Sequence, residues 1–204
     1  ASSGFSELPD LSGLELGAET AYVHTTSNNT IYGTQWQSLP TFGDVPHVCD
    51  MSSDIFSRPV DVSGFKLIYA GAQKNAGPAG VTLVIIDKAW MAQAREDIPA
   101  IWRYATHAAK DSMYNTPPTF AWYVAGKIFQ WLKSMGGVSE MEKINNRKAK
   151  KLYSFIDQSG FYENKINKED RSIMNIPFQL NDENLNSKFI KESIDAGLLA
   201  LKGH

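Results

Sequence analysis

The chain has 204 residues, of which 43% are hydrophobic and 21% charged, and its formal net charge at pH 7 is -2. Such a chain can bury a sizeable core as one domain or two small ones. The small net charge gives no electrostatic reason to expect binding to nucleic acid or to an anionic membrane surface, and no uninterrupted apolar stretch reaches the roughly 18 residues of a membrane span.

Cysteine usage and the N-terminal sequence bear on the cellular compartment. Cys49 is the only cysteine, so an internal disulfide cannot form, which favours the reducing cytoplasm. The N-terminus lacks the basic and apolar regions of a signal peptide. The chain begins at Ala1 rather than at a methionine. We therefore expect a cytoplasmic protein whose sequence is processed, tagged or partial.

Short apolar runs recur between loops in the first half of the sequence. They cover residues 21–25, 46–50, 65–71 and 81–86. The last run carries the β-branched enrichment of a buried strand. We expect the four runs to form interior strands of one sheet.

Helical periodicity replaces this pattern further along the chain. Residues 117–137 have apolar side chains at helical spacing and end on two glycines. The predicted apolar face consists of Phe120, Val124, Ile128, Trp131 and Leu132.

A second long helix is predicted to begin at Ser139, where Glu142 completes a capping box. Its basic residues, within 147–151, fall largely on one side, and we interpret them as a solvated helix face. The opposite, apolar side is predicted to contain Met141, Ile144, Leu152 and Phe155.

The C-terminal third combines both patterns. Residues 171–180 alternate as a strand, and residues 183–197 are predicted to form a helix that ends at Gly197. The fold class is therefore mixed α/β, and we expect a boundary between its two compositional halves within residues 87–117.

One lysine stands at the end of a predicted strand among small residues. In the segment YAGAQKN, residues 69–75, the strand narrows to Gly71 and Ala72 before Lys74, and residues 75–80 turn the chain into the next strand. Ligands of open α/β sheets bind at strand ends. The glycines form neither a P-loop nor a G-x-G-x-x-G turn. An ordinary solvated lysine is the alternative interpretation.

A lysine in such a place can act as a nucleophile. Partial desolvation weakens the preference of its amine for the charged form, and the neutral amine condenses with an aldehyde to a Schiff base. Pyridoxal phosphate is the obvious biological aldehyde, and its ring nitrogen needs a carboxylate. Asp50 ends one predicted strand and Lys74 follows the next, so in adjacent parallel strands both would reach one crevice. Asp50 could alternatively serve only the turn of residues 50–54.

Two long segments carry a resemblance to a known family. They are VCDMSSDIFSRPVDVSGFKLIYAGAQKNAGPAGVTLVII, residues 48–86, and DSMYNTPPTFAWYVAGKIFQWLKSMGG, residues 111–137. The chain resembles the phosphoserine aminotransferases, class V aminotransferases of the fold type I pyridoxal phosphate enzymes. The similarity continues through residues 171–180 to AGLLALKGH at the C-terminus, and leaves residues 1–19 without a motif.

The resemblance implies a cofactor site in this chain. Lys74 corresponds to the Schiff-base lysine, which is both covalent anchor and acid/base, and Asp50 to the carboxylate paired with the ring nitrogen of pyridoxal phosphate. Gln73 and Thr30 correspond to polar groups around the cofactor. The resemblance implies no metal site.

The resemblance also implies a homodimer. In this family the YNTPP segment reaches across the dimer interface, so Asn115 and Thr116 would bind the cofactor phosphate of the neighbouring subunit. His204 matches a histidine close to the substrate phosphate. The implied reaction transfers the amino group of glutamate to 3-phosphohydroxypyruvate, in serine biosynthesis and, in bacteria, in pyridoxal phosphate biosynthesis.

Parts of the family pattern are missing from this sequence. It lacks the glycine-rich phosphate turn, the aromatic residue that stacks on the cofactor and the arginine that grips the substrate carboxylate. We therefore expect a central fragment that is inactive alone. Residues 1–134 would be part of the fold type I large domain, with its mixed, mostly parallel sheet, and residues 135–204 part of the smaller α+β C-terminal domain.

Three alternatives remain open at this point. Another class V aminotransferase or a cysteine desulfurase would share Asp50 and Lys74, although Cys49 inside a strand suits buried packing better than desulfurase chemistry. A cofactor-free Schiff-base lyase would keep Lys74 and leave Asp50 without a role. A noncatalytic interaction fragment would keep only the fold and the dimer surface.

Overall fold

The structure is a computed structural model that describes residues 4–202. The chain divides into two compact units. We call unit 1 the described parts of Ala1–Asp10, Asn28–Gln37 and Ile144–His204, and unit 2 the segments Leu11–Ser27 and Ser38–Lys143. The domain limit expected between residues 134 and 135 stays a prediction.

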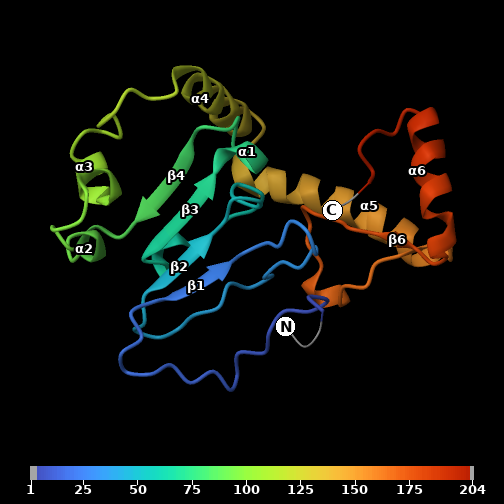
Figure 1. The fold of residues 1–204 in the computed structure, drawn as a ribbon, viewed down its shortest axis with the longest axis horizontal. Helices are drawn as coiled ribbons and strands as arrows, with labels where there is room; N and C mark the ends of the chain where they lie inside the picture. The colour runs from blue at the N-terminus through green and yellow to red at the C-terminus, as the bar shows by residue number, and fades with distance from the viewer. Residues whose placement is uncertain (1–3, 203–204) are drawn as a thin grey trace. The chain divides into compact units, whose positions relative to one another are not determined.

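Unit 2 is built on a four-stranded sheet in the order β1-β2-β3-β4 (Figure 1). The strands are β1 (Val23–Thr26), β2 (His47–Asp50), β3 (Leu67–Gly71) and β4 (Thr82–Ile86). The β1–β2 and β2–β3 pairs are parallel, whereas β4 runs antiparallel to β3. The predicted mixed, mostly parallel sheet is confirmed.

The expectation that all four strands are interior is wrong. In the described sheet β1 and β4 are the two edge strands, because each pairs with one neighbour only. On β4, Val84 is 38% exposed and Ile85 is 41% exposed. The apolar, β-branched composition of this strand is therefore not accounted for by burial within the described residues.

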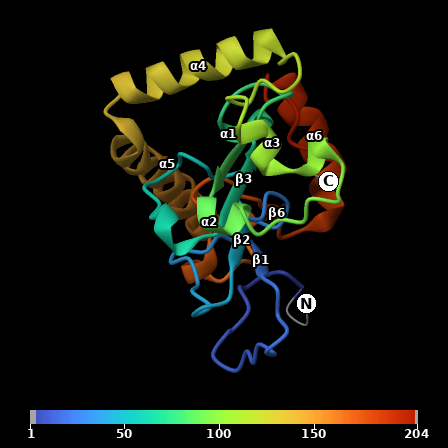
Figure 2. The ribbon, with the colours of Figure 1, turned by 90° about the vertical axis from the view of Figure 1, so that its left-hand side faces the viewer.

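Helices and short helical turns complete unit 2. In Figures 1 and 2, α4 lies at the end of the sheet where α1 follows β3. The elements are η1 (Val62–Gly64), α1 (Ala72–Asn75), α2 (Lys88–Met91), η2 (Ala100–Trp102), α3 (Tyr104–Ala108) and α4 (Thr119–Ser134).

The core of unit 2 forms on the inner strands and on the turns at their ends. Phe56 and Phe129 of α4 close over it with an edge-on ring contact, their centroids 5.4 Å apart. Its buried members are Cys49, Met51, Ile55, Phe65, Ile68, Ala70, Ala72 and Ala76.

Helix α4 packs through its small residues, so the predicted apolar face is wrong in part. Phe120 and Trp131 are 76% and 52% exposed, whereas Ala121 and Ala125 are buried. A Cβ atom added at Gly77 would lie only 3.2 Å from the Cβ of Ala125. This close approach leaves no room for a ring, so the alanine stripe packs against the turn after α1.

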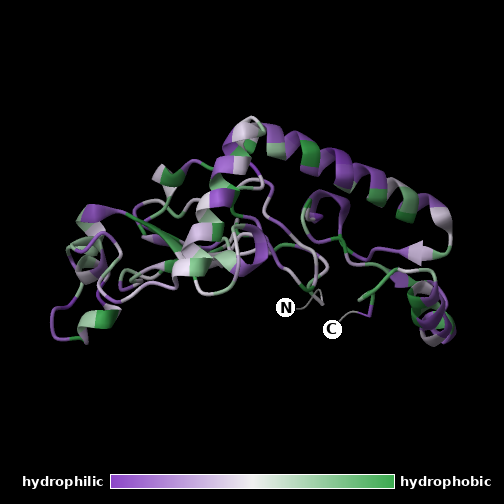
Figure 3. Ribbon diagram, turned by 90° about the horizontal axis from the view of Figure 1, so that it is seen from above, coloured by the Kyte–Doolittle hydropathy of each residue, from purple (hydrophilic) through white to green (hydrophobic). Residues whose placement is uncertain are grey.

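Unit 1 contains most of α5 (Gly137–Ser159), which begins two residues before the predicted Ser139. Its buried positions are Asn145, Ala149 and Ile156, and the expected apolar residue Phe155 is 60% exposed. Apart from Ala149, residues 147–151 are exposed as predicted, and Figure 3 shows hydrophilic residues along most of the helix. Neither α5 nor any other helix within residues 4–202 is long and apolar enough to cross a membrane.

The predicted strand over residues 171–180 is wrong except at its end. Only β6 (Gln179–Leu180) is a strand, paired with β5 (Tyr162–Glu163). The hydroxyl of Ser172 accepts hydrogen bonds from the backbone N–H groups of Met174 and Asn175, at 3.0 and 2.9 Å. Such local bonds compete with a strand ladder and favour a turn.

The last predicted helix is confirmed. After η3 (Lys168–Asp170) and η4 (Glu183–Leu185), α6 spans Asn186–Asp195. Gly197 has a φ of +83°, and its N–H donates to the carbonyl of Ile194 at 2.9 Å. Glycine adopts this left-handed conformation at little cost, which is why helices end at such residues.

The contact between α4 and the turn after α1 predicts how a larger residue at Gly77 would affect stability. We expect Gly77→Val to lower the free energy of unfolding by about 1–3 kcal/mol, because the added methyl groups would overlap Ala125. As a control, Gly126→Ala in α4 has no heavy atom within 4 Å of the new Cβ and should stabilise the helix by about 0.5–1 kcal/mol. Urea unfolding measures both. Equal stabilities of Gly77→Val and the parent would contradict the packing described.

Candidate active site

Asp50 is the last residue of β2 and is partly exposed. Its Oδ1 accepts a hydrogen bond from the backbone N–H of Ser52 at 2.8 Å. On the neighbouring strand its register partner is Tyr69. The carboxylate is therefore held by a backbone donor at the carboxyl end of a parallel strand, where ligands of α/β sheets bind.

Lys74 lies on α1, the single helical turn that directly follows β3, rather than on a loop. Since β2 and β3 are parallel, the predicted placement of Asp50 and Lys74 at the same end of adjacent strands is confirmed. Backbone and side-chain hydrogen bonds fix the turn. The Ala72 N–H donates to the Val81 carbonyl at 2.9 Å, and the Asn75 side chain donates to the Ile55 carbonyl at 2.5 Å.

The small residues around Lys74 serve the protein's own packing. Ala72 and Ala76 are completely buried in the core. A Cβ atom at Gly71 would lie 2.7 Å from Oε1 of Gln73, whose amide folds back over the glycine. Lys74 itself is exposed. The expectation of a partly desolvated lysine is therefore not met in the described chain, because the glycine and alanines leave space for core contacts.

Two residues near Asp50 were not foreseen. Tyr69 pairs with Asp50 in the ladder, so both side chains project from the same face of the sheet. Nε2 of His24 lies 3.0 Å from the Tyr69 hydroxyl. Burial and the nearby Asp50 carboxylate raise the pKa of Tyr69. The alternation within each strand was readable from the sequence, but the register that brings these residues together was not.

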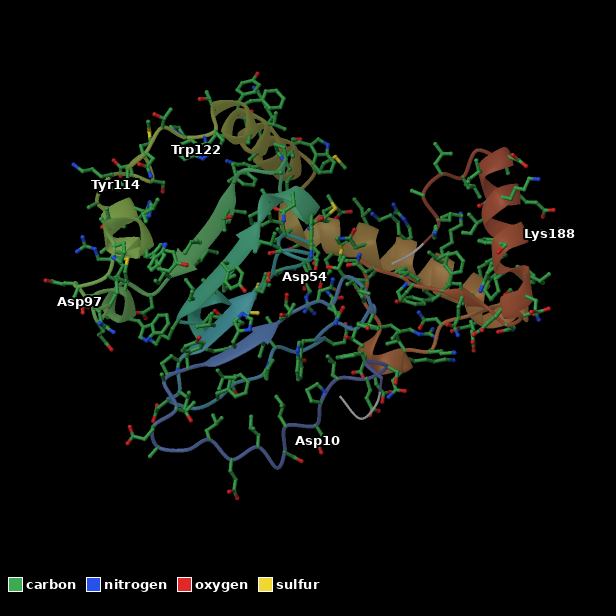
Figure 4. All side chains as sticks on the ribbon, in the orientation of Figure 1. Asp10, Asp54, Asp97, Tyr114, Trp122 and Lys188 are labelled. Atoms are coloured by element: carbon green, nitrogen blue, oxygen red, sulfur yellow. The ribbon has the colours of Figure 1, made fainter. Side chains whose placement is uncertain are left out.

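Buried polar groups tie β1 to the turn after β2. The Ser27 N–H donates to the Asp50 carbonyl at 3.0 Å, and its hydroxyl donates to the carboxylate of Asp54. Ser27 is 1% exposed and Asp54 4% exposed. Figure 4 shows Asp54 at the end of the sheet where α1 lies. The backbone next to the Asp50 side chain is thus anchored from the β1 side.

Thr30, Asn115 and Thr116, the other predicted cofactor residues, lie on turns and connections. Thr30 belongs to unit 1 and is exposed on a turn closed by a 2.7 Å hydrogen bond from the Asn29 N–H to the Thr34 carbonyl. Asn115 and Thr116 are exposed on the connection between α3 and α4. Their roles toward the cofactor stay predictions.

Figure 4 places Tyr114, the neighbour of Asn115, beside α3 and apart from Asp54. The structure therefore does not bring this segment together with Asp50 and Lys74 within one chain. The predicted substrate residue His204 lies outside the described residues.

A family model described as "Aminotransferase class-V" matches residues 5–204. The chain belongs to this family. Among curated class-V relatives, phosphoserine aminotransferase of Lysinibacillus sphaericus is 51% identical over 201 residues, and that of Hahella chejuensis is 52% identical over 202 residues. These matches cover 98% and 99% of the chain and 56% of each relative. The chain spans about half the length of the curated relatives it matches.

Solved structures agree with this class-V assignment. Phosphoserine aminotransferase from Bacillus circulans subsp. alkalophilus is 43% identical with a TM-score of 0.95, and the match covers 100% of this chain and 56% of that one. The pyridoxal phosphate-bound enzyme from Trichomonas vaginalis is 37% identical with a TM-score of 0.90, over 98% of this chain and 57% of that one.

The thiol of this class-V chain is placed for packing rather than chemistry. Cys49 is completely buried, and the Thr25 hydroxyl donates to its sulfur at 3.4 Å. Burial raises the pKa of Cys49 to about 11. A thiol that stays protonated at neutral pH is a poor nucleophile. The sequence-based interpretation of Cys49 as a buried residue is confirmed, which disfavours the desulfurase alternative.

The burial of Cys49 predicts that its thiol reacts slowly with alkylating reagents. We expect iodoacetamide at pH 8 to leave the folded protein unmodified on a time scale on which a free thiol reacts completely, because the thiolate population and the access are both small. Full labelling in 6 M guanidinium, counted by mass spectrometry, is the control. Rapid stoichiometric labelling of the folded protein would mean that the thiol is reactive.

Proposed function

We propose that this chain is part of a phosphoserine aminotransferase, which transfers the amino group of glutamate to 3-phosphohydroxypyruvate with pyridoxal phosphate. The observation that carries the proposal is the placement of Asp50 and Lys74 at the same end of adjacent parallel strands in a class-V aminotransferase chain. Relatives of that name at about half identity support the substrate assignment.

The donor set at this end of the sheet suits pyridoxal phosphate. The amine of Lys74 matches the cofactor's aldehyde, and the Asp50 carboxylate matches a protonated ring nitrogen. Because Asp50 already accepts the Ser52 N–H through Oδ1 at 2.8 Å, its orientation is set before any ligand arrives. Lys74 is exposed on the turn that follows β3. Amine and carboxylate together are the two groups that this cofactor requires from a strand-end site.

Each residue then has a separate task in the reaction. Bound pyridoxal phosphate supplies the electron sink that stabilises negative charge at the substrate α-carbon. Lys74 Nζ would hold the cofactor covalently, and the same amine would move a proton away from the substrate α-carbon and later return one. The Asp50 carboxylate would keep a proton on the ring nitrogen of the bound cofactor. Stabilisation of this charge matters most as it develops, which is where it lowers the barrier.

The remaining assignments follow the family resemblance. We propose that Thr30 and Gln73 bind the same cofactor, and that His204 lies near the substrate phosphate. Asn115 and Thr116 would serve the neighbouring subunit of a homodimer. Their exposure on a connection between helices supports this role, because it leaves them accessible to a second chain.

The family resemblance also supports the domain and pathway assignments. Residues 1–134 would belong to the cofactor-binding domain and residues 135–204 to the C-terminal domain. The protein would act in serine biosynthesis. Its one cysteine, fully buried, supports a reducing cytoplasmic location, because it is used for packing and forms no internal disulfide.

The covalent assignment is tested by chemical trapping. Borohydride reduction of the protein loaded with pyridoxal phosphate, followed by peptide mapping, should place the pyridoxyl group on Lys74. Lys66, at the other end of β3 and ion-paired with Asp87 at 2.9 Å, is the internal control and should remain unlabelled. Lys74→Ala should abolish labelling and lower turnover by at least about a hundredfold, the usual scale for a lost acid/base group. Label on Lys66 instead would refute the site.

The carboxylate assignment is tested by mutation. We expect Asp50→Ala in the full-length protein to reduce turnover at least about a hundredfold, as for other preorganised charges. The matched control is Asp61→Ala, which removes an exposed aspartate whose side chain accepts hydrogen bonds from Ser63 in its own turn. That variant should retain parental turnover in a spectrophotometric transamination assay. Near-normal turnover of Asp50→Ala would contradict the assignment and mean that Asp50 serves only the turn.

A further inference from the structure

Ser52 makes two hydrogen bonds that reach both candidate catalytic positions. Its N–H donates to Oδ1 of Asp50 at 2.8 Å, and its hydroxyl accepts the N–H of Gly71 at 3.0 Å. Gly71 ends β3 and directly precedes α1, the turn that carries Lys74. One serine in the turn after β2 therefore touches the carboxylate on one strand and the backbone that leads to the amine on the next.

The Ser52 hydroxyl takes the place of a missing rung in the β2–β3 ladder. The last backbone rung runs from the Met51 N–H to the Tyr69 carbonyl at 2.9 Å. In a continued parallel ladder the next donor, the Gly71 N–H, would bond to the carbonyl of Met51. That carbonyl instead accepts the N–H of Ile55 at 2.8 Å, within the turn that follows β2. The Gly71 donor is therefore satisfied by a side chain, not by backbone.

The position of α1 depends on a small number of such contacts. The helix has only four residues and lacks a side-chain cap, and one turn of helix is not stable by itself. Besides the bond from Gly71 to Ser52, it is held by Ala72 bonding to Val81 and by Asn75 bonding to Ile55. Loss of one contact should therefore loosen the backbone around Lys74 more than a similar loss inside a long helix.

We propose that Ser52 is a positioning residue, which fixes the Asp50 carboxylate and the Lys74-bearing turn relative to one another by bridging the ends of β2 and β3. It does so without touching the reacting atoms. The inference rests on the proposed function only in that Asp50 and Lys74 must be the two groups that engage the cofactor. It adds a residue whose role is geometric, and whose hydroxyl can be removed while its backbone bond to Asp50 remains.

The first test needs no cofactor. Ser52→Ala removes the acceptor for Gly71 and should speed amide hydrogen exchange at Gly71 about threefold to tenfold, the scale of one lost hydrogen bond. Ser52→Thr keeps the hydroxyl and should restore slow exchange. Ser63→Ala is the control, because that hydroxyl donates to exposed Asp61 in its own turn. Equal exchange at Gly71 in Ser52→Ala and the parent would overturn the bridge.

The second test measures the consequence for the site in the full-length protein. Ser52→Ala should raise the Kd for pyridoxal phosphate about threefold to tenfold and shift the pH midpoint of the visible absorbance of the loaded protein, whereas Ser52→Thr should match the parent. In an Asp50→Ala background the Ser52→Ala effect should shrink, because one of the two bridged groups is gone. A purely structural serine would lower the melting temperature and leave the pH midpoint unchanged.

The outcomes distinguish the positioning role of Ser52 from the proposed function. If borohydride labels Lys74 in the parent but Ser52→Ala changes neither the Kd nor the pH midpoint, the positioning role is wrong and the proposed function stands. If the parent takes up no pyridoxal phosphate at Lys74, the proposed function fails. Faster exchange at Gly71 would then still establish the structural bridge, and its catalytic meaning would be refuted.

Discussion

The parallel pairing of β2 with β3, and the place where it stops, governs the geometry of unit 2. The ladder ends at the bond from Met51 to Tyr69, after which β2 turns into residues 51–55 and β3 continues into α1. Asp50 and Lys74 both lie close to the point where the backbones that continue β2 and β3 diverge. Divergence leaves backbone donors without partners, and short polar side chains such as Ser52 satisfy them.

Residues 69–75 contain both buried core residues and Lys74 of the candidate site. Ala72 is completely buried, while Lys74 two positions on is exposed. Helix α4 approaches the following turn through Ala125 and Gly77, so the one-turn helix is supported from the core side and open on the other. The role proposed for Lys74 needs an accessible side chain together with a fixed backbone. Small residues on the core side fix the backbone without blocking access to the side chain.

The elements predicted correctly from the sequence are those with a local sequence signal. Apolar runs located the four strands, and Gly197 marked the end of α6 correctly. The failed predictions concern residues whose conformation depends on distant partners. Residues 171–180 alternate like a strand, yet Ser172 draws the next backbone donors into a turn and bonds through its hydroxyl to the buried side chain of Asn28. The local sequence around Ser172 gives no indication that Asn28 is its partner.

The candidate site shows the same limit at finer scale. Strand-end logic was enough to pair Asp50 with Lys74, but Tyr69 and Ser52 required the register. The register pairs buried residues on both faces of the sheet: Val48 with Leu67, 6% and 8% exposed, on one face, and Cys49 with Ile68, 0% and 2% exposed, on the other. The same register places Asp50 and Tyr69 together on the face opposite Cys49 and Ile68. Packing on both faces of the sheet thus sets the position of the candidate catalytic carboxylate, because Val48 and Leu67 are buried on the same face as Asp50.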